Sequence, residues 1–139
     1  MAYSLAMTEI ETVQELLTAL AAADLERALA LVSDDIVYQN RPLPESRGKR
    51  AFERQMRAFQ RFGDFQVETH HIAADGVAVL TERTDTFVMR GVPVSFWVYG
   101  TFEVRDGRVE VWRDAFDWMT LLARFGVALP RILAGSASP

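Results

Sequence analysis

The stretch VAVLTERTDTFVMRGVPVSFWVYGTFEVRDGRVEVWRDAFDW, residues 77–118, decides the fold of this chain. Apolar and polar residues alternate along it, which is the period of strands with one buried face. Asp106-Gly107 within the stretch and Asp75-Gly76 just before it are typical of tight hairpin turns. The pattern predicts four consecutive antiparallel strands, namely Phe65–Ala73, Val77–Met89, Val92–Arg105 and Arg108–Trp118.

Helices are expected ahead of these strands. Thr8 and Glu11 have the spacing of a capping box, and apolar residues follow them at helical intervals. Asp24 is suited to cap a second, shorter helix, which we expect to extend through Val32. A third helix is expected between Gly48 and Gly63, with aromatic and other apolar residues on one side.

This order of elements predicts an α+β fold, with a curved, mainly antiparallel mixed sheet covered by the N-terminal helices. A short strand, Ile36–Asn40, is expected to join the sheet, and Leu121–Ile132 is expected to add a helical turn or two. The chain shows no linker, repeat or low-complexity block. We therefore expect one domain over residues 1–139, with residues 1–7 and 134–139 flexible.

The composition disfavours several classes of protein. The formal charge is −4 and the basic residues are scattered, so a nucleic-acid partner is not expected. The chain has no cysteine, no signal-peptide pattern and no uncharged run long enough to span a bilayer, which together favour a cytoplasmic protein without a membrane partner. His70 and His71 should point to opposite faces of a strand, so no metal site is expected.

Three charged side chains lie on strand faces that should be buried. Arg83 and Asp85 share one face of their strand, and Asp114 lies among aromatic residues on another. Charged groups are rarely buried unless paired, so we expect Arg83 to bridge the two carboxylates. Such a network could serve only to fix strand register, but Tyr38 and Asn40 on a third inward face favour a functional site. The residues expected to line the substrate pocket are Trp112, Phe116, Phe87 and Met89.

The charge of this cluster suggests a mechanism. One arginine and two ionised aspartates carry a net charge of −1, which is unfavourable in an apolar cavity. A single proton makes the cluster neutral, so we expect Asp85 and Asp114 to share one near neutral pH. The cluster would then hold one carboxylic acid and one carboxylate, which is the equipment for simultaneous general acid and general base catalysis.

The polar motifs resemble the limonene-1,2-epoxide hydrolase family. They are Tyr38-Gln39-Asn40 before Pro42-Leu43-Pro44, then Thr81-Glu82-Arg83-Thr84-Asp85, then Trp112-Arg113-Asp114-Ala115-Phe116-Asp117. The resemblance covers most of the chain and implies a limonene-epoxide-hydrolase-like domain with a cone-shaped pocket, as in nuclear transport factor 2-like (NTF2-like) and SnoaL-like proteins. It also implies a homodimer.

The resemblance implies roles for the site residues as well. Asp114 would be the general base, Tyr38 and Asn40 would hold the attacking water, and Asp85 would protonate the epoxide oxygen. Arg83 would bridge the aspartates. Hydrolysis of a small apolar epoxide to a vicinal diol would proceed in one step, with no cofactor and no metal.

Two other functions remain open on the sequence alone. One is an isomerase or cyclase of the same fold, like ketosteroid isomerases or polyketide cyclases, and the other is small-ligand binding without catalysis. Arg41 borders the Asn40 motif, and a side chain reaching inward there would weaken the expectation of a purely apolar substrate. Asp117 is expected on the face opposite Asp114, as the partner of a surface or interface cation. The sequence leaves open whether the segment after Met119 covers the pocket.

Overall fold

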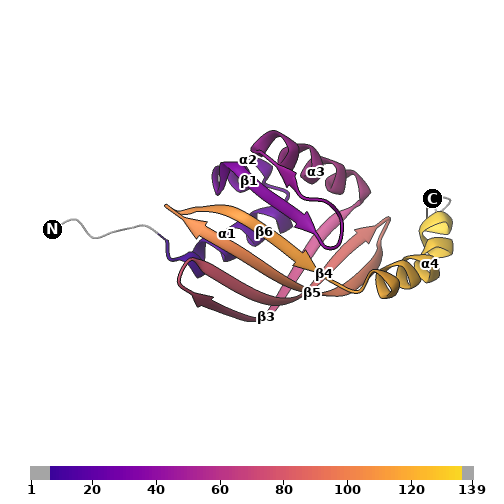
Figure 1. Cartoon of the computed structure of the whole chain (residues 1–139). Coiled ribbons are helices and arrows are strands. Elements are labelled where there is room, and N and C mark those ends of the chain that lie inside the picture. The colour runs from indigo at the N-terminus through magenta and orange to yellow at the C-terminus, as the bar shows by residue number, and fades with distance from the viewer. Residues whose placement is uncertain (1–6, 136–139) are drawn as a thin grey trace.

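The computed structural model describes residues 7–135, which form a six-stranded sheet with helices over one face (Figure 1). The elements in chain order are α1 (Glu9–Ala21), α2 (Leu25–Ala30), β1 (Val32–Asn40), β2 (Ser46–Arg47), α3 (Lys49–Phe62), β3 (Asp64–Asp75), β4 (Ala78–Met89), β5 (Val92–Arg105), β6 (Arg108–Ala115) and α4 (Trp118–Gly135). The strand order is β2-β1-β6-β5-β4-β3, with β1 parallel to β6 and the other neighbours antiparallel. This confirms the predicted α+β class and mixed sheet.

Most of the two terminal segments expected to be flexible lies outside the described residues. Residues 1–6 and 136–139 are among these, so the structure does not test that expectation for them. Met7 packs against the main core, and residues 134 and 135 form the last turn of α4. Within the described part of the chain, no helix has the length and apolar content needed to cross a membrane.

The N-terminal helices begin where their capping residues predict. The Thr8 and Glu11 side chains each accept a hydrogen bond from the other residue's backbone N–H, at 3.1 and 3.0 Å, so the capping box is confirmed. The side chain of Asp24 caps α2. The prediction that this helix reaches Val32 is wrong, because Val32 already belongs to β1 and is paired with β6. The polar residues 33–35 also form part of this irregular strand.

The secondary structure of the C-terminal part of the chain differs more from the prediction than that of the N-terminal helices does. β6 ends at Ala115, and an 18-residue helix follows instead of one or two turns. Asp117 begins this helix, because its side chain accepts bonds from the backbone N–H groups of Met119 and Thr120 at 3.0 and 3.2 Å. Its predicted role as the partner of a cation is therefore replaced by helix capping.

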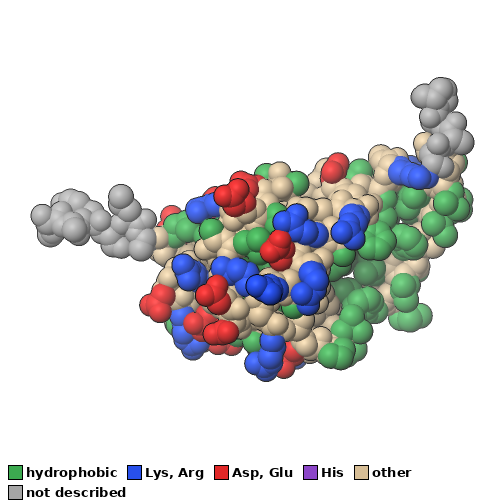
Figure 2. All heavy atoms as spheres, turned by 90° about the horizontal axis from the view of Figure 1, so that it is seen from above, with side chains coloured by type: hydrophobic (Ala, Val, Ile, Leu, Met, Phe, Trp, Pro, Cys, Tyr) green, Lys and Arg blue, Asp and Glu red, His purple; other side chains and the backbone are tan. Residues whose placement is uncertain are grey.

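The helix α4 lies at one end of the molecule (Figure 1) and has its own small core. Ala128 and Ile132 pack against residues of the β4–β5 hairpin, namely Met89, Val92 and Val94. This burial outweighs the low helix propensity of Gly126 and Pro130, which disfavour a long helix in isolation. Hydrophobic side chains gather at this end of the molecule, whereas charged side chains cover much of the remaining face in Figure 2.

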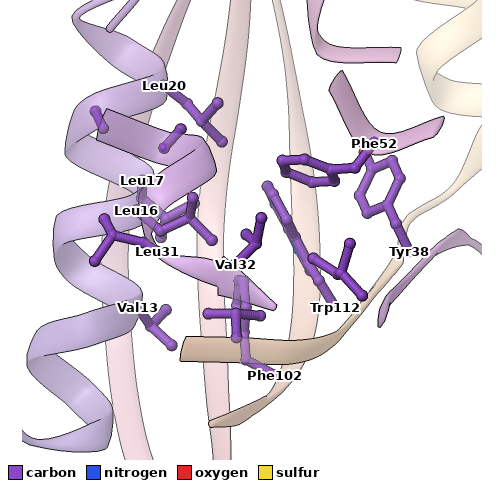
Figure 3. Packing of buried hydrophobic residues seen from close by; sticks show 14 of the residues in the cluster. Val13, Leu16, Leu17, Leu20, Leu31, Val32, Tyr38, Phe52, Phe102 and Trp112 are labelled. Atoms are coloured by element: carbon purple, nitrogen blue, oxygen red, sulfur yellow. The ribbon is translucent and has the colours of Figure 1, made fainter. Parts of the chain in front are cut away.

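The main core lies between the helices and the inner face of the sheet. The apolar stripe of α1, which includes Val13 and Leu16, faces an aromatic group from the strands and α3 (Figure 3). In that group the ring of Trp112 stacks on Phe102 with centroids 5.1 Å apart, and Tyr38 meets Trp112 edge-on at 5.1 Å. These rings form an apolar floor beside which the charged residues of the inner face are held.

Candidate active site

The polar residues of the inner face are neighbours because of the strand register. Thr81 of β4 is paired with Gly100 of β5, Gly100 with Asp114 of β6, and Asp114 with Asn40 of β1. These four residues therefore form one row across four strands. Arg83 lies two positions along β4 from Thr81, on the same face, so its long side chain can reach across this row.

The guanidinium of Arg83 joins both carboxylates. Towards Asp85, Nε donates to Oδ1 at 3.0 Å and Nη2 donates to Oδ2 at 2.8 Å. Towards Asp114, Nη1 donates to Oδ1 at 3.2 Å and Nη2 donates to Oδ2 at 2.9 Å. Nη1 also donates to Thr81 Oγ1 at 3.1 Å. A guanidinium has five N–H bonds, so all five have an acceptor, and both carboxylates are held by two parallel bonds.

This network is buried. The Arg83 side chain is fully buried, and Asp85 and Asp114 are each 5% exposed. Burial raises the pKa of the Asp114 carboxyl, and the charge and hydrogen bonds of Arg83 offset only part of that rise. Burial alone would lower the pKa of Arg83, but the two aspartates outweigh it and raise that pKa above its ordinary value. The arginine therefore stays charged, while Asp114 holds a proton more readily than an exposed aspartate does.

Tyr38 and Asn40 lie beside Asp114 and bond to each other. Asn40 Nδ2 donates to the hydroxyl oxygen of Tyr38 at 3.2 Å, which leaves the tyrosine's own O–H proton for a molecule in the cavity. Burial and the nearby charge of Asp114 raise the pKa of Tyr38, so this hydroxyl stays protonated. A small polar molecule placed here would meet an O–H donor, an amide and a carboxylate.

A cavity of about 480 Å³ opens above these groups. Asp85, Asp114, Tyr38 and Asn40 supply polar atoms to its wall, whereas most of the lining is apolar. Such a combination of a largely apolar cavity with a few convergent polar groups is typical of small-molecule sites.

Three of the four residues expected to line the pocket do so. Trp112, Phe87 and Phe116 face the cavity, and Phe116 reaches it from just beyond the end of β6. Met89 does not line it and packs in the α4 core, because β4 has by then reached the hairpin that α4 covers. Strand alternation placed Met89 on the correct face but did not show which element covers that end of the strand.

Other lining residues were missed by the sequence analysis. They come mainly from helices and from β5, and include Met56, Phe59, Phe65, Phe96, Trp118 and Leu121. Met56 and Phe59 lie on the apolar side expected for the third helix, but helical spacing does not distinguish residues that face the cavity from residues that face the core. Phe96 is paired with Asp85 across the β4–β5 ladder, so the register alone could have identified it. Its ring meets that of Phe116 edge-on at 5.1 Å and extends the aromatic wall.

The sequence left two points open: whether Arg41 reaches into the pocket, and whether the segment after Met119 covers it. Arg41 is exposed and does not line the cavity, while its carbonyl oxygen accepts a bond from Trp118 Nε1 at 2.6 Å. The first turn of α4 contributes Trp118 and Leu121 to the cavity wall, whereas Ala128 and Ile132 pack against the hairpin. Of the described residues after Met119, those that border the pocket therefore lie in the first turn of α4.

Residues 7–135 contain no group of three histidine, cysteine or acidic side chains placed to hold a metal ion. His70 bonds to Thr84 Oγ1 at 2.8 Å, and its ring stacks on Trp97 with centroids 4.4 Å apart. These contacts engage His70 on the outer face of the sheet, away from the carboxylate pair.

Comparison with known proteins points to one family. The model of the limonene-1,2-epoxide hydrolase (LEH) catalytic domain matches residues 7–126. Epoxide hydrolase EphG of Mycobacterium tuberculosis is 45% identical over 105 residues, which are 76% of this chain and 70% of EphG. The solved structure of an LEH-like epoxide hydrolase of M. tuberculosis has a TM-score of 0.82 at 39% identity, covering 91% of this chain and 95% of that one.

A more distant relative shows how widely this fold is shared. An NTF2-like protein of unknown function from Cytophaga hutchinsonii has a TM-score of 0.71 at 17% identity, covering 86% of this chain and 99% of that one. A likeness at this level of identity concerns the fold alone, and it agrees with the expected NTF2-like architecture.

Proposed function

This chain belongs to the limonene-1,2-epoxide hydrolase family, and on that premise we propose that it adds water to an apolar epoxide to give a vicinal diol. One observation carries the proposal: Arg83 holds two buried carboxylates side by side at the polar end of an apolar cavity. Epoxide opening needs a proton for the oxygen that leaves the ring carbon and a base for the attacking water. A pair that shares one proton can supply both.

In the proposed reaction, Asp114 is the general base. Its raised pKa makes it a stronger proton acceptor than an exposed aspartate, and Tyr38 and Asn40 lie close enough to hold the water that it activates. The water oxygen bonds to a ring carbon, the carbon–oxygen bond of the ring breaks, and Asp85 gives its proton to that oxygen. Asp114 receives the proton that the water loses, so the reaction needs no covalent intermediate.

The charge of the cluster does not change during this reaction. One carboxylate gains a proton as the other loses one, and Arg83 remains bonded to both. No net charge therefore builds up in the apolar cavity, where charge separation is costly. Returning the proton from Asp114 to Asp85 restores the starting state before the next turnover.

Isotope labelling tests the proposal. Incubation of the protein with limonene-1,2-epoxide in ¹⁸O-labelled water is expected to give a diol with one labelled oxygen. Asp85→Asn and Asp114→Asn should each lower kcat by about 10²–10⁴-fold, the usual contribution of a general acid or base. Asp106→Asn, in the turn after β5, is the matched control and should retain full activity.

The other outcomes separate the alternatives. Conversion of the substrate without incorporation of label would point to an isomerase. Ligand binding without turnover, unchanged in Asp85→Asn, would point to a protein that only binds. Either result would exclude the hydrolysis proposed here.

We further propose that the chain acts in the cytoplasm as a homodimer. The outer face of the sheet supports this assembly, because Trp97 and Tyr99 of β5 are 46% and 58% exposed there and Leu80 of β4 is 50% exposed. Exposed aromatic residues on a sheet face are typical of a surface that another chain covers.

A further inference from the structure

Gly100 occupies the middle of the polar row on the inner face of the sheet. It is paired with Thr81 on one side and with Asp114 on the other. The two nearest β5 residues on the same face, Val98 and Phe102, are both fully buried and fill their positions with side chains. At Gly100 that space is filled by the head group of Arg83.

The space beside Gly100 is too small for any side chain. A Cβ atom at this position would lie 2.4 Å from Arg83 Nη1, 2.6 Å from Asp114 Oδ1 and 2.9 Å from Thr81 Oγ1. These distances are well below ordinary contact, so a methyl group there requires at least one of the three atoms to move.

The three atoms cannot move independently. Arg83 Nη1 donates to both of the other two, at 3.1 Å to Thr81 Oγ1 and 3.2 Å to Asp114 Oδ1. The Thr81 hydroxyl in turn donates to the Gly100 carbonyl at 3.2 Å. A displacement of any member therefore breaks hydrogen bonds that hold the guanidinium between the carboxylates.

Backbone conformation does not explain the glycine. The residue lies within a continuous strand, and the positive-φ glycines of the described chain are Gly48, Gly76, Gly91 and Gly107, all outside the strands. A glycine inside a strand weakens that strand, and it is typically found where another group approaches the backbone closely. Here that group is the guanidinium, which also lies 5.9 Å from the ring centre of Phe102 and 6.0 Å from that of Trp112.

We propose that Gly100 is a positioning residue: its missing side chain forms the slot that holds the Arg83 guanidinium in line with both aspartates. The inference rests on the proposed function for its effect on turnover, but the slot itself is a property of the ligand-free protein. The slot fixes the spacing of the acid and the base, so its loss should affect the chemical step more than substrate binding.

Gly100→Ala tests this positioning role, with limonene-1,2-epoxide as the probe. We expect kcat to fall by about 100-fold, the usual cost of misplacing catalytic groups by about 1 Å, while KM changes little. The pH–rate profile should also shift, because the bonds that Arg83 makes to Asp114 are altered. The matched control is Gly126→Ala in α4, where a Cβ meets nothing within 4 Å, and it should leave both constants unchanged. A lower melting temperature with unchanged kcat and pH profile would overturn the proposal.

A second measurement needs no turnover and separates this inference from the proposed function. Melting temperatures are compared for wild type, Gly100→Ala, Arg83→Lys and the double variant, because lysine has no Nη1 atom in the slot. The methyl group should lower the melting temperature clearly in the wild-type background and much less in the Arg83→Lys background. If Gly100→Ala fails to fold but the double variant folds, that result would also support the slot. An equal loss in both backgrounds, or failure of both to fold, would show that the sheet needs Gly100 whatever occupies residue 83.

Discussion

Replacing Arg83 by lysine measures how much the protein depends on the shape of the guanidinium. The substitution keeps the positive charge between Asp85 and Asp114. It removes the planar fork, because a lysine ammonium has three N–H donors where the guanidinium uses five. At least two of the acceptors on Asp85, Asp114 and Thr81 must therefore lose a hydrogen bond.

The number of lost bonds sets the expected effect. A hydrogen bond to a charged group contributes about 1.5–3 kcal/mol, so two of them correspond to about 3–6 kcal/mol. Breaking a buried ion pair costs about 3–5 kcal/mol, and this independent estimate of the loss agrees with the first. Because lysine keeps the charge, we expect the lower end, about 3 kcal/mol. For a domain of this size that lowers the melting temperature by roughly 10 °C.

Thermal unfolding followed by circular dichroism at neutral pH measures this loss. The control is Arg113→Lys, because Arg113 lies on the outer face of β6 and makes partly exposed ion pairs with Glu45 and Glu103. Such pairs contribute about 1 kcal/mol or less, so the control should melt within a few degrees of wild type. If Arg83→Lys melts as high as Arg113→Lys, the five-donor network does not hold the site together and the reasoning is wrong.

Three further predictions concern pH and assembly. Because burial raises the Asp114 pKa above its ordinary 3.8, the folded state holds this proton more tightly than the unfolded state. Wild type should therefore lose stability relative to Asp114→Asn as the pH rises from about 4 towards neutrality, and a constant difference between their melting curves would contradict this. Trp112→Phe removes a 2.7 Å bond that lowers the Asp114 pKa, so the acidic limb of the pH–rate profile should move to higher pH. Wild type should sediment as a dimer and the double variant Trp97→Glu/Tyr99→Glu as a monomer. A double variant that still sediments as a dimer would contradict a contact through the outer face.

The charged part of the site was predictable because strands obey a simple rule. Side chains two positions apart share a face, so Arg83 and Asp85 had to lie together, and Asp114 had to share the face of Trp112. Burial of these charges then required them to pair. The structure brings them together as expected, and the only information needed beyond alternation was the order of the strands.

The rest of the cavity was less predictable because it depends on how separate elements meet. Helical spacing indicated an apolar side for α3 but not which of its residues face the cavity rather than the core. Phe52 is fully buried in the core, whereas Phe59 lines the cavity. The length of α4 depends on burial against the β4–β5 hairpin, and this contact is not visible in the local sequence. Alternation puts Thr81 on the same face as Arg83, but the hydrogen bond between their side chains depends on the side-chain conformation of Arg83, which the sequence does not show.

The two aspartates differ in their surroundings although they share one guanidinium, and this difference supports opposite roles. Asp114 accepts an additional bond from Trp112 Nε1 and is paired across the sheet with Asn40, so it lies on the side where water would be held. Asp85 is paired with Phe96, on the side where the aromatic wall begins. A molecule with a polar oxygen on an apolar body would place its carbon skeleton along that wall and its oxygen near Asp85. We therefore expect the base, Asp114, beside the water and the acid, Asp85, beside the substrate oxygen. If the two roles were exchanged, the base would lie beside the substrate oxygen and the acid beside the water, so neither proton could be transferred directly.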